Sequence, residues 1–417
     1  MSAHSRPNLP QREAIRYLDG PLLVLAGAGS GKTRVITEKI AHLIEACGLS
    51  PGNIAAITFT NKAAREMQER VSRLLAGKST RGLTISTFHS LGVRILREEV
   101  DALGYRPNFS ILDATDCFAI VSELAGSADK ATIRRLQALI SQWKSSLVSP
   151  DEARGIARGE YEVLAAEVFA NYAATLRAYQ AVDFDDLIVL PVALFEKQPA
   201  LRDKWQNRLR YLLIDEYQDT NVSQYRLLHL LAGPRAAFTA VGDDDQAIYG
   251  WRGADVANLR GLPRDYPNLK IIKLEQNYRS TVRILKAANA LIAHNEKLFD
   301  KKLWSDLGHG EPITVRCCAD QEKEAEAVVM TLQAHRFEHR GAFRDLSRKF
   351  PGASDRAFSA RPARSLPALG RTVLLRENGD QGHYLLSATA HQPRGRPCVP
   401  ARRRRTEPRR RQQHLAG

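Results

Sequence analysis

The segment Ala26–Thr33, which reads AGAGSGKT, could bind the phosphate chain of a nucleotide. It directly follows the apolar run Pro21–Leu25, so the pattern predicts a buried strand, a glycine-rich turn and then a helix. Backbone N–H groups of such a turn can surround phosphate oxygens, Lys32 can reach the β- and γ-phosphates, and the Thr33 hydroxyl can bind Mg²⁺. The usual pattern begins with glycine where this chain has Ala26, so the match is one glycine short. The context nevertheless predicts that the chain binds a nucleoside triphosphate.

A second group of candidate residues follows the apolar run Tyr211–Ile214. Asp215 and Glu216 end this predicted strand. In ATPases with a phosphate loop, an aspartate in this position holds Mg²⁺, and a neighbouring glutamate can orient or deprotonate the attacking water. Arg279, in the segment QNYRS (276–280), is a candidate arginine finger that would stabilise the transferring phosphoryl group. A strand end followed by Asp-Glu is common on surfaces, but the phosphate loop favours the functional interpretation. A lone arginine after a strand is usually a surface residue, so the role of Arg279 depends on a resemblance to a known family.

The segment 243–253, which reads DDDQAIYGWRG, follows another predicted strand. Gln246 can hydrogen-bond a γ-phosphate, whereas Tyr249 and Trp251 offer flat faces on which bases can stack, with Arg252 beside them. The alternative is that the two aromatic residues belong to the core. The polar residues around them favour a nucleic-acid contact.

Apolar runs alternate with amphipathic helical patterns over the first 90 residues, and apolar runs resume near residue 209. This alternation predicts an α/β fold in which helices cover both faces of a parallel sheet. Residues 91–179 show a mostly helical pattern, which predicts a helical insertion into the α/β domain. The expected strands are 22–26, 54–59, 83–87, 209–215, 237–241, 270–274 and 313–316, and the expected helices outside the insertion are 34–45, 62–75 and 321–335.

The composition limits the possible classes of protein. The chain has 417 residues, of which 44% are hydrophobic and 26% are charged, which is typical of a globular protein with two or three domains. No apolar stretch has the length of a membrane-spanning helix, and the N-terminus lacks the apolar core of a signal peptide. The five cysteines form no C-x-x-C pair, and their odd number argues against a disulfide framework. We therefore expect a cytoplasmic protein that does not act on a membrane.

The net charge of +15 comes mainly from the C-terminal part of the chain. Residues 341–417 hold 17 Lys and Arg residues but only 5 Asp and Glu residues. Residues 346–417 are rich in Arg and Pro and lack a helical or alternating period, so we expect a disordered basic tail. This tail is interpreted either as a basic arm for nucleic acid or as an aberrant sequence that follows a shift of reading frame.

Together these segments resemble superfamily 1 DNA helicases of the UvrD/Rep/PcrA group, and the Rep type most of all. The resemblance covers about the first 345 residues and rests on eight segments in the order that the family has them. They are Asn8 with Gln11, AGAGSGKTR (26–34), TFTNKAAREM (58–67), STFHS (86–90), DFDDLI (183–188), IDEYQDTN (214–221), VGDDDQAIYGWRGA (241–254) and LEQNYRS (274–280).

The resemblance implies a RecA-like P-loop NTPase fold with a helical insertion. Residues 1–91 and 181–275 would form the first RecA-like, ATP-binding domain, 92–180 the helical insertion, 276–345 the beginning of a second RecA-like domain, and 346–417 the aberrant or disordered tail. Later family motifs similar to T-x-H-x-x-K-G-L-E and V-G-I-T-R-A do not occur. We therefore expect an incomplete N-terminal portion of such a helicase.

The resemblance also implies a role for each matching residue. Gln11 would contact the adenine edge and Tyr278 would stack on its ring. The phosphates would be held by Ala26, Gly27, Ala28, Gly29, Ser30, Gly31, Lys32, Thr33, Arg34 and Arg279, the Mg²⁺ ion by Thr33 and Asp215, and catalysis would depend on Lys32, Glu216, Gln246 and Arg279. Single-stranded DNA would contact Thr58, Phe59, Asn61, His89, Tyr249, Trp251 and Arg252.

The function implied is that of an ATP-dependent 3′→5′ DNA helicase or translocase in replication or repair. Its substrate would be single-stranded or forked duplex DNA, with ATP as the energy source, Mg²⁺ as the metal cofactor and a replication-fork protein as a further partner. The alternative is a nucleotide-dependent single-stranded DNA-binding protein without unwinding activity, and a third interpretation is an inert product of an incomplete fold. The sequence leaves the oligomeric state open.

Overall fold

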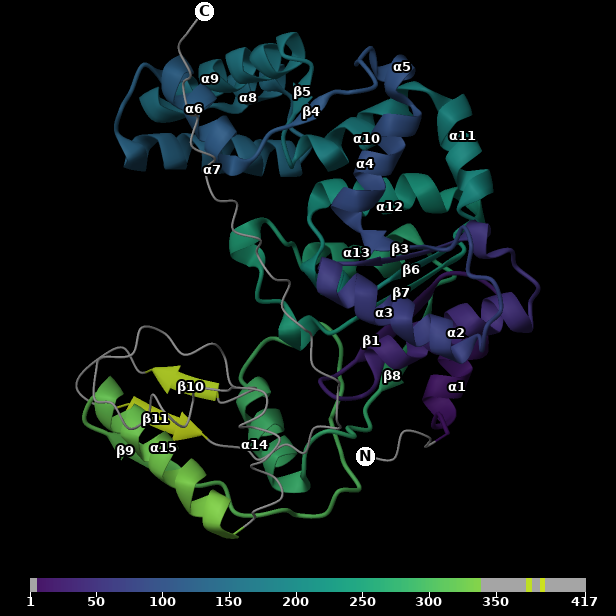
Figure 1. Ribbon diagram of the computed structural model, residues 1–417, viewed down its shortest axis with the longest axis vertical. Helices are drawn as coiled ribbons and strands as arrows, with labels where there is room; N and C mark the ends of the chain where they lie inside the picture. Colours follow the sequence, from purple (N-terminus) through teal and green to yellow (C-terminus); the bar gives the residue numbers. More distant parts are fainter. Residues whose placement is uncertain (1–5, 339–372, 377–382, 387–417) are drawn as a thin grey trace, which may run out of the picture. The chain divides into compact units, whose positions relative to one another are not determined.

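The computed structural model describes residues 6–338, 373–376 and 383–386 (Figure 1). The chain divides into two compact units, one formed by residues 4–310 and the other mainly by residues 311–417. Within the described part of the chain, no helix combines the length and the apolar character needed to cross a membrane.

A sheet of six parallel strands forms the centre of the unit 4–310, in the order β3-β2-β6-β7-β1-β8. The strands are β1 (Leu22–Ala26), β2 (Ile54–Thr58), β3 (Thr84–Thr87), β6 (Tyr211–Ile214), β7 (Phe238–Gly242) and β8 (Lys270–Leu274). Strands β1, β2, β6 and β7 are buried along their whole length, which explains their nearly continuous apolar sequences. The carboxyl ends of these parallel strands share one edge of the sheet, where ligands usually bind in folds of this kind.

Helices cover both faces of this sheet, as the sequence predicts (Figure 1). Alternate residues of β1 belong to different apolar clusters: Leu22 and Val24 pack on one face and Leu23 and Leu25 on the other. The first face is covered by α1 (Leu9–Arg16), α2 (Lys32–Glu45) and α3 (Asn61–Leu74), and the second by α4 (Phe88–Glu98), α10 (Asp186–Lys197), α11 (Pro199–Arg208), α12 (Val222–Ala232) and α13 (Ala257–Asp265).

A helical segment with its own apolar cluster separates β3 from β6 in the sequence. It contains α5 (Val100–Leu103), α6 (Ala114–Ala125), α7 (Lys130–Ser145), α8 (Pro150–Ile156) and α9 (Gly159–Ala178). Two short strands that the sequence analysis did not predict, β4 (Ser110–Ile111) and β5 (Ala181–Val182), pair in parallel within this segment. The buried side chain of Lys144 lies 2.7 Å from Oδ1 of Asp183 and 2.6 Å from Oδ1 of Asp186, so an ionic cluster joins α7 to the start of α10.

The remaining elements complete the described chain. Helix α14 (Val282–Ile292) belongs to the unit 4–310, and the other unit contains β9 (Val315–Cys318), α15 (Gln321–Glu338), β10 (Val373–Arg376) and β11 (His383–Leu386). These three strands form an antiparallel sheet in the order β10-β11-β9. The short 3₁₀ helices are η1 (Pro51–Asn53), η2 (Tyr217–Asp219), η3 (Gly233–Arg235), η4 (Asp244–Gln246) and η5 (Gly250–Arg252).

Most expected elements occur, with small differences at their ends. The expected strand 209–215 is limited to Tyr211–Ile214, and the expected strand 313–316 occurs as Val315–Cys318. Helix α2 begins at Lys32 rather than at residue 34. Within the predicted tail 346–417, the described residues form the strands β10 and β11, and the rest of that prediction lies outside the described residues.

Candidate functional site

The predicted phosphate loop is a tight turn between β1 and α2. Gly29 and Gly31 have φ angles of +73° and +93°, which glycine adopts without the steric penalty of a side chain. Gly31 is the N-cap of α2 and offers no side chain to the N–H groups of the first helical turn. Helix N-termini of this kind attract anions, because their N–H groups point outward and the helix dipole is positive there.

A segment far along the chain packs directly against this loop. The backbone N–H of Tyr278 donates to the carbonyl of Gly29 at 3.0 Å, and the side chain of Asn277 donates to the carbonyl of Ala28. A Cβ atom at Gly29 would lie 2.7 Å from Cβ of Arg279, so only glycine permits this close approach. The structure therefore brings the predicted residues Tyr278 and Arg279 to the phosphate loop, together with Asn277, to which the sequence analysis gave no role.

Gln11 also contacts the loop and is buried. Its Nε2 donates to the carbonyl of Ser30 at 2.8 Å, and its Oε1 accepts from the backbone N–H of Asn8 at 3.0 Å. The side chain of Asn8 in turn donates to Gln276, which also accepts from the Tyr278 hydroxyl at 2.8 Å. The two residues expected to contact adenine are thus connected through Asn8 and Gln276.

The carboxyl end of β6 places an acidic pair beside the loop. Nζ of Lys32 lies 2.9 Å from Oε2 of Glu216. Glu216 has φ +50° and ψ +47°, a left-handed conformation that is costly for a residue with a side chain and that often marks functional sites. Burial, with a smaller contribution from Glu216, raises the pKa of Asp215 to about 7. Burial and Glu216 likewise raise the pKa of Asp219 to about 6, and Oδ1 of Asp219 has no hydrogen-bond partner among the described residues.

These carboxylates fit the binding of a divalent cation. An uncompensated buried carboxylate is costly, and a bound cation would remove the repulsion between Asp215 and Glu216 that contributes to the raised pKa of Asp215. Oxygen atoms of carboxylates and hydroxyls are also the ligands that Mg²⁺ prefers. The predicted ligand Asp215 directly follows β6, and the predicted ligand Thr33 lies in the first turn of α2.

Gln218 is a buried residue that the sequence analysis quoted in a motif but to which it gave no role. Its Nε2 donates to Oε2 of Glu216 at 3.0 Å, and its Oε1 accepts from the backbone N–H of Asp243 at 3.0 Å. It therefore links the carboxyl end of β6 to that of β7. Only the fold reveals this link, because nothing in the sequence indicates that a glutamine is buried.

The segment after β7 holds the predicted residue Gln246, whose side chain donates to the carboxylate of Asp243. Asp243, Asp244 and Asp245 surround the ammonium group of Lys301, another residue without a predicted role. Burial lowers the pKa of Lys301, but the attraction of Asp243 and Asp244 outweighs it, so the pKa is raised. A cation from within the protein therefore offsets part of the charge of the acidic triplet.

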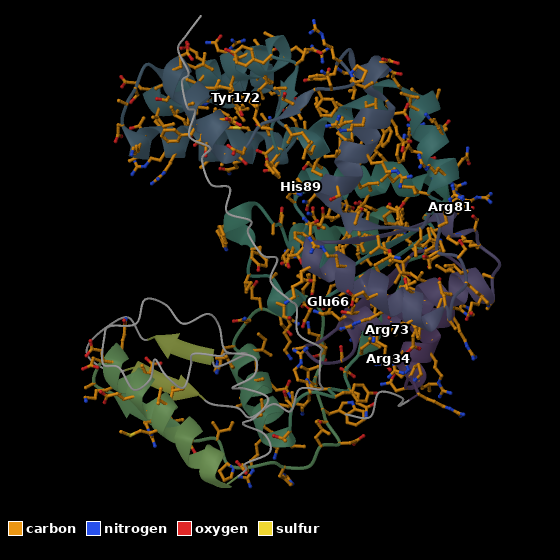
Figure 2. The ribbon with its side chains drawn as sticks, in the orientation of Figure 1. Arg34, Glu66, Arg73, Arg81, His89 and Tyr172 are labelled. Carbon is orange, nitrogen blue, oxygen red and sulfur yellow. The ribbon has the colours of Figure 1, made fainter. Side chains whose placement is uncertain are left out.

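The residues expected to contact DNA fall into two groups. Trp251 is 74% exposed and its ring centroid lies 6.3 Å from that of Tyr249, in the loop after β7 that also holds Arg252, whose side chain is outside the described part. His89, at the start of α4 (Figure 2), contacts the ring of Phe184 with 5.9 Å between centroids. Phe184 is 55% exposed and was not predicted, although an aromatic residue inside the charged motif DFDDLI is a usable signal.

The other predicted residues occupy less exposed or more local positions. Thr58 is buried at the end of β2, Phe59 is half-buried against Phe88, and Asn61 is exposed at the start of α3. In the phosphate loop, the hydroxyl of Ser30 donates to the carbonyl of Gly27 at 2.7 Å, and Arg34 pairs with Glu38 at 2.6 Å.

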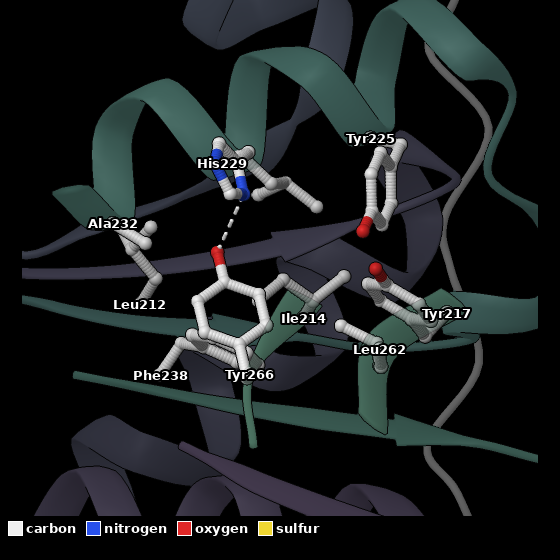
Figure 3. A pocket seen from close by; sticks show the side chains of 10 residues that line it. Leu212, Ile214, Tyr217, Tyr225, His229, Ala232, Phe238, Leu262 and Tyr266 are labelled. Atoms are coloured by element: carbon white, nitrogen blue, oxygen red, sulfur yellow. Dashed lines mark hydrogen bonds between the residues drawn. The ribbon is translucent and has the colours of Figure 1, made fainter. Parts of the chain in front are cut away.

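A small, partly open pocket lies between α12 and the sheet (Figure 3). Its volume is about 10 Å³ and its lining is mainly apolar. Tyr266 and His229 line it and are hydrogen-bonded at 3.0 Å. None of its lining residues is a predicted site residue, so the pocket is a packing feature rather than the site.

Two family models and several curated relatives match this chain. The family model of the UvrD/REP helicase N-terminal domain matches residues 8–267, and that of the UvrD-like helicase C-terminal domain matches residues 272–347. The ATP-dependent DNA helicase Rep of Escherichia coli (strain K12) is 52% identical over 350 residues, which cover 83% of this chain and 52% of that protein. The ATP-dependent DNA helicase PcrA of Leuconostoc citreum is 43% identical over 344 residues, which cover 82% of this chain and 46% of that protein. The chain thus spans about half the length of the curated relatives it matches.

Proposed function

Because this chain belongs to the UvrD/Rep helicase family, we propose that it is an ATP-dependent DNA helicase or translocase of the Rep type. The observation that carries the proposal is the ion pair of 2.9 Å between Lys32 and Glu216. It joins the residue that would hold the phosphates to the residue that would activate water. Two such groups in contact at the carboxyl edge of one sheet form the core of an ATP-hydrolysing site.

The phosphate chain of ATP would bind to the backbone N–H groups of the loop and to Lys32, which would move from Glu216 to the β- and γ-phosphates. The nucleotide-binding residues would be Gln11, Ala26, Gly27, Ala28, Gly29, Ser30, Gly31, Lys32, Thr33, Arg34, Tyr278 and Arg279. Gln11 is held by one hydrogen bond at each end of its amide, and because an amide has two N–H donors and two acceptor lone pairs, it can contact adenine while both bonds remain.

Hydrolysis would then depend on the side chains around the γ-phosphate. Glu216, released from Lys32, would accept a proton from the attacking water, while Gln246 and Arg279 would contact the transferring group. A Mg²⁺ ion held by Thr33 and Asp215 would neutralise phosphate charge. Gln218 would keep Glu216 oriented, since its amide donates to the same carboxylate oxygen as Lys32.

Single-stranded or forked duplex DNA is the proposed substrate, with 3′→5′ movement in replication or repair. Exposed aromatic rings are suited to stack on bases whatever their sequence, and Trp251, Tyr249 and Phe184 offer such rings. Thr58, Phe59, Asn61, His89 and Arg252 would complete the DNA contacts. We further propose the domain layout given above, a cytoplasmic location and a protein partner at the replication fork.

The test is a steady-state ATPase assay of the full chain with and without single-stranded DNA, followed by unwinding of a fluorescently labelled fork. DNA-stimulated hydrolysis that Lys32→Ala abolishes would support the proposed motor. Binding of ATP and DNA without turnover would contradict it and identify a nucleotide-dependent DNA-binding protein instead.

A further inference from the structure

Lys301 is a buried cation at the carboxyl edge of the sheet, outside the residues to which the proposed function gives a role. Its side chain is hydrogen-bonded to the carboxylates of Asp243 and Asp244, and its Nζ lies 3.0 Å from Oδ2 of Asp245. Only 5% of the Lys301 side chain is exposed. One ammonium group therefore contacts three consecutive aspartates and offsets part of their negative charge.

The acidic triplet needs this cation to keep its conformation. Asp243 is only 2% exposed, and an unpaired buried carboxylate is strongly destabilising. Without Lys301, the carboxylates of Asp243 and Asp244 would repel each other, and the segment after β7 would separate them. Removal of the charge would thus move the triplet rather than leave it in place.

The carboxylate of Asp243 connects Lys301 to Gln246. One carboxylate oxygen of Asp243 contacts Lys301, and the other accepts from the side-chain amide of Gln246. The backbone N–H of Asp243 donates to Gln218 at 3.0 Å, which fixes the residue from the side of β6. Lys301 and Gln246 therefore share one carboxylate, so the position of Gln246 depends on the ion pair.

The short segment Lys301–Trp304 also reaches the phosphate loop. A Cβ atom at Gly27 would lie 2.3 Å from Cδ2 of Leu303, so the Leu303 side chain rests directly on the loop. Trp304 holds this segment in place, because its N–H donates to the carbonyl of Glu275 at 3.0 Å and its carbonyl accepts from Asn277 at 2.7 Å. This one segment thus contacts the loop that would bind the phosphates through Leu303 and the acidic triplet through Lys301. Within the triplet, Asp243 is the residue that binds Gln246.

We propose that Lys301 is a positioning residue that, through the Asp243 carboxylate, sets Gln246 where it can distinguish a nucleoside triphosphate from a diphosphate. The inference rests on the proposed function, because it requires a nucleotide at the phosphate loop. It does not require that the chain completes hydrolysis or unwinds DNA.

The experiment compares the affinities of the full chain for ATPγS and for ADP by isothermal titration calorimetry with Mg²⁺ present. We expect Lys301→Met to lower the preference for ATPγS over ADP by about tenfold or more, because a hydrogen bond within a charged network is misplaced. The ADP affinity should stay within about twofold, since ADP lacks the group that Gln246 contacts. Lys301→Arg, which keeps the charge, should restore most of the preference.

Lys302→Met is the matched control, because Lys302 is the exposed neighbour whose backbone N–H, not its side chain, bonds to Glu275. An unchanged preference in Lys301→Met, or an equal loss in Lys302→Met, would overturn the inference. Lys301→Gln, which keeps a hydrogen-bond donor, serves if the methionine variant does not fold. If both variants lose ADP binding or unfold, Lys301 stabilises the fold and the inference is also overturned.

The result separates this inference from the proposed function. A wild-type chain that prefers ATPγS, loses this preference in Lys301→Met and hydrolyses no ATP would support the inference and contradict the proposed motor. A wild-type chain that hydrolyses ATP but whose nucleotide preference does not change in Lys301→Met would do the reverse.

Discussion

Nζ of Lys32 lies 2.9 Å from Oε2 of Glu216, an oxygen that also accepts from Nε2 of Gln218 at 3.0 Å. Lys32, the first residue of α2, and Gln218 are therefore linked through the carboxylate of Glu216. Phosphate groups at the loop would compete with Glu216 for Lys32. Binding of a nucleotide would therefore release Glu216, the candidate base, from its ion pair with Lys32.

Replacement of Lys32 by alanine should abolish nucleotide hydrolysis. The variant loses the cation for the β- and γ-phosphates, so we expect kcat/KM for ATP to fall by about 10²–10³-fold or more. Lys78→Ala is the control, because Lys78 pairs with Glu45 on the surface. Equal ATPase rates in Lys32→Ala and the wild type would contradict the assigned site.

Replacement of Trp251 by alanine should weaken the binding of single-stranded DNA. One lost stacking partner costs about 1–3 kcal/mol, and the loss should vary little with base sequence. Fluorescence anisotropy with oligonucleotides of two compositions measures it. Tyr179→Ala removes another exposed ring, at the end of α9, and should leave the affinity unchanged. A loss of the same size in both variants would argue against a stacking role for Trp251.

Lys39 should make stability depend on pH. Its ammonium group is buried, donates to the carbonyls of Ala14 and Tyr17 at 2.8 and 2.6 Å, and has a pKa that burial lowers from 10.5 to about 7. Below about pH 7, both the folded and the unfolded chain carry the proton, so the cost of burying the charge is fully present.

Between about pH 7 and 10.5, only the unfolded chain keeps this proton, so the free energy of unfolding should rise with pH. The expected slope is about 1.4 kcal/mol per pH unit. Urea unfolding of the wild type and of Lys39→Met at pH 7 and pH 9 isolates the contribution of Lys39, because other titrating groups are common to both chains. Parallel pH dependence of the two chains would show that Lys39 does not titrate in this range.

Replacement of Lys144 by methionine should destabilise the junction between α7 and α10. The variant leaves the buried carboxylates of Asp183 and Asp186 without a cation, which typically costs about 3–5 kcal/mol. The triple variant with Asp183→Asn and Asp186→Asn should recover part of this loss, because the two carboxylates that paired with Lys144 are removed as well. Lys297→Met, at a surface pair with Asp300, is the control in urea unfolding. If the triple variant is no more stable than Lys144→Met, uncompensated charge is not the cause.

The sequence by itself determined the features that depend on neighbouring residues. The phosphate loop is recognisable because its glycines, Lys32 and Thr33 act within a single turn. The strands of the sheet are recognisable because a buried parallel strand must be apolar throughout. The order of the strands was not predicted, since β6 joins β2 only after a helical segment of more than a hundred residues.

Only the tertiary structure decided which polar groups are buried together. Lys301 and Asp243 are 58 residues apart and Lys144 and Asp183 are 39 apart, so no local period relates them. A lysine or glutamine in a sequence is by default a solvated residue, and its burial depends on a partner that the fold supplies. The sequence therefore identified the residues that would touch ATP, whereas the fold identified Gln218 and Lys301, because their hydrogen bonds form only when β6, β7 and the segment Lys301–Trp304 meet at one edge of the sheet.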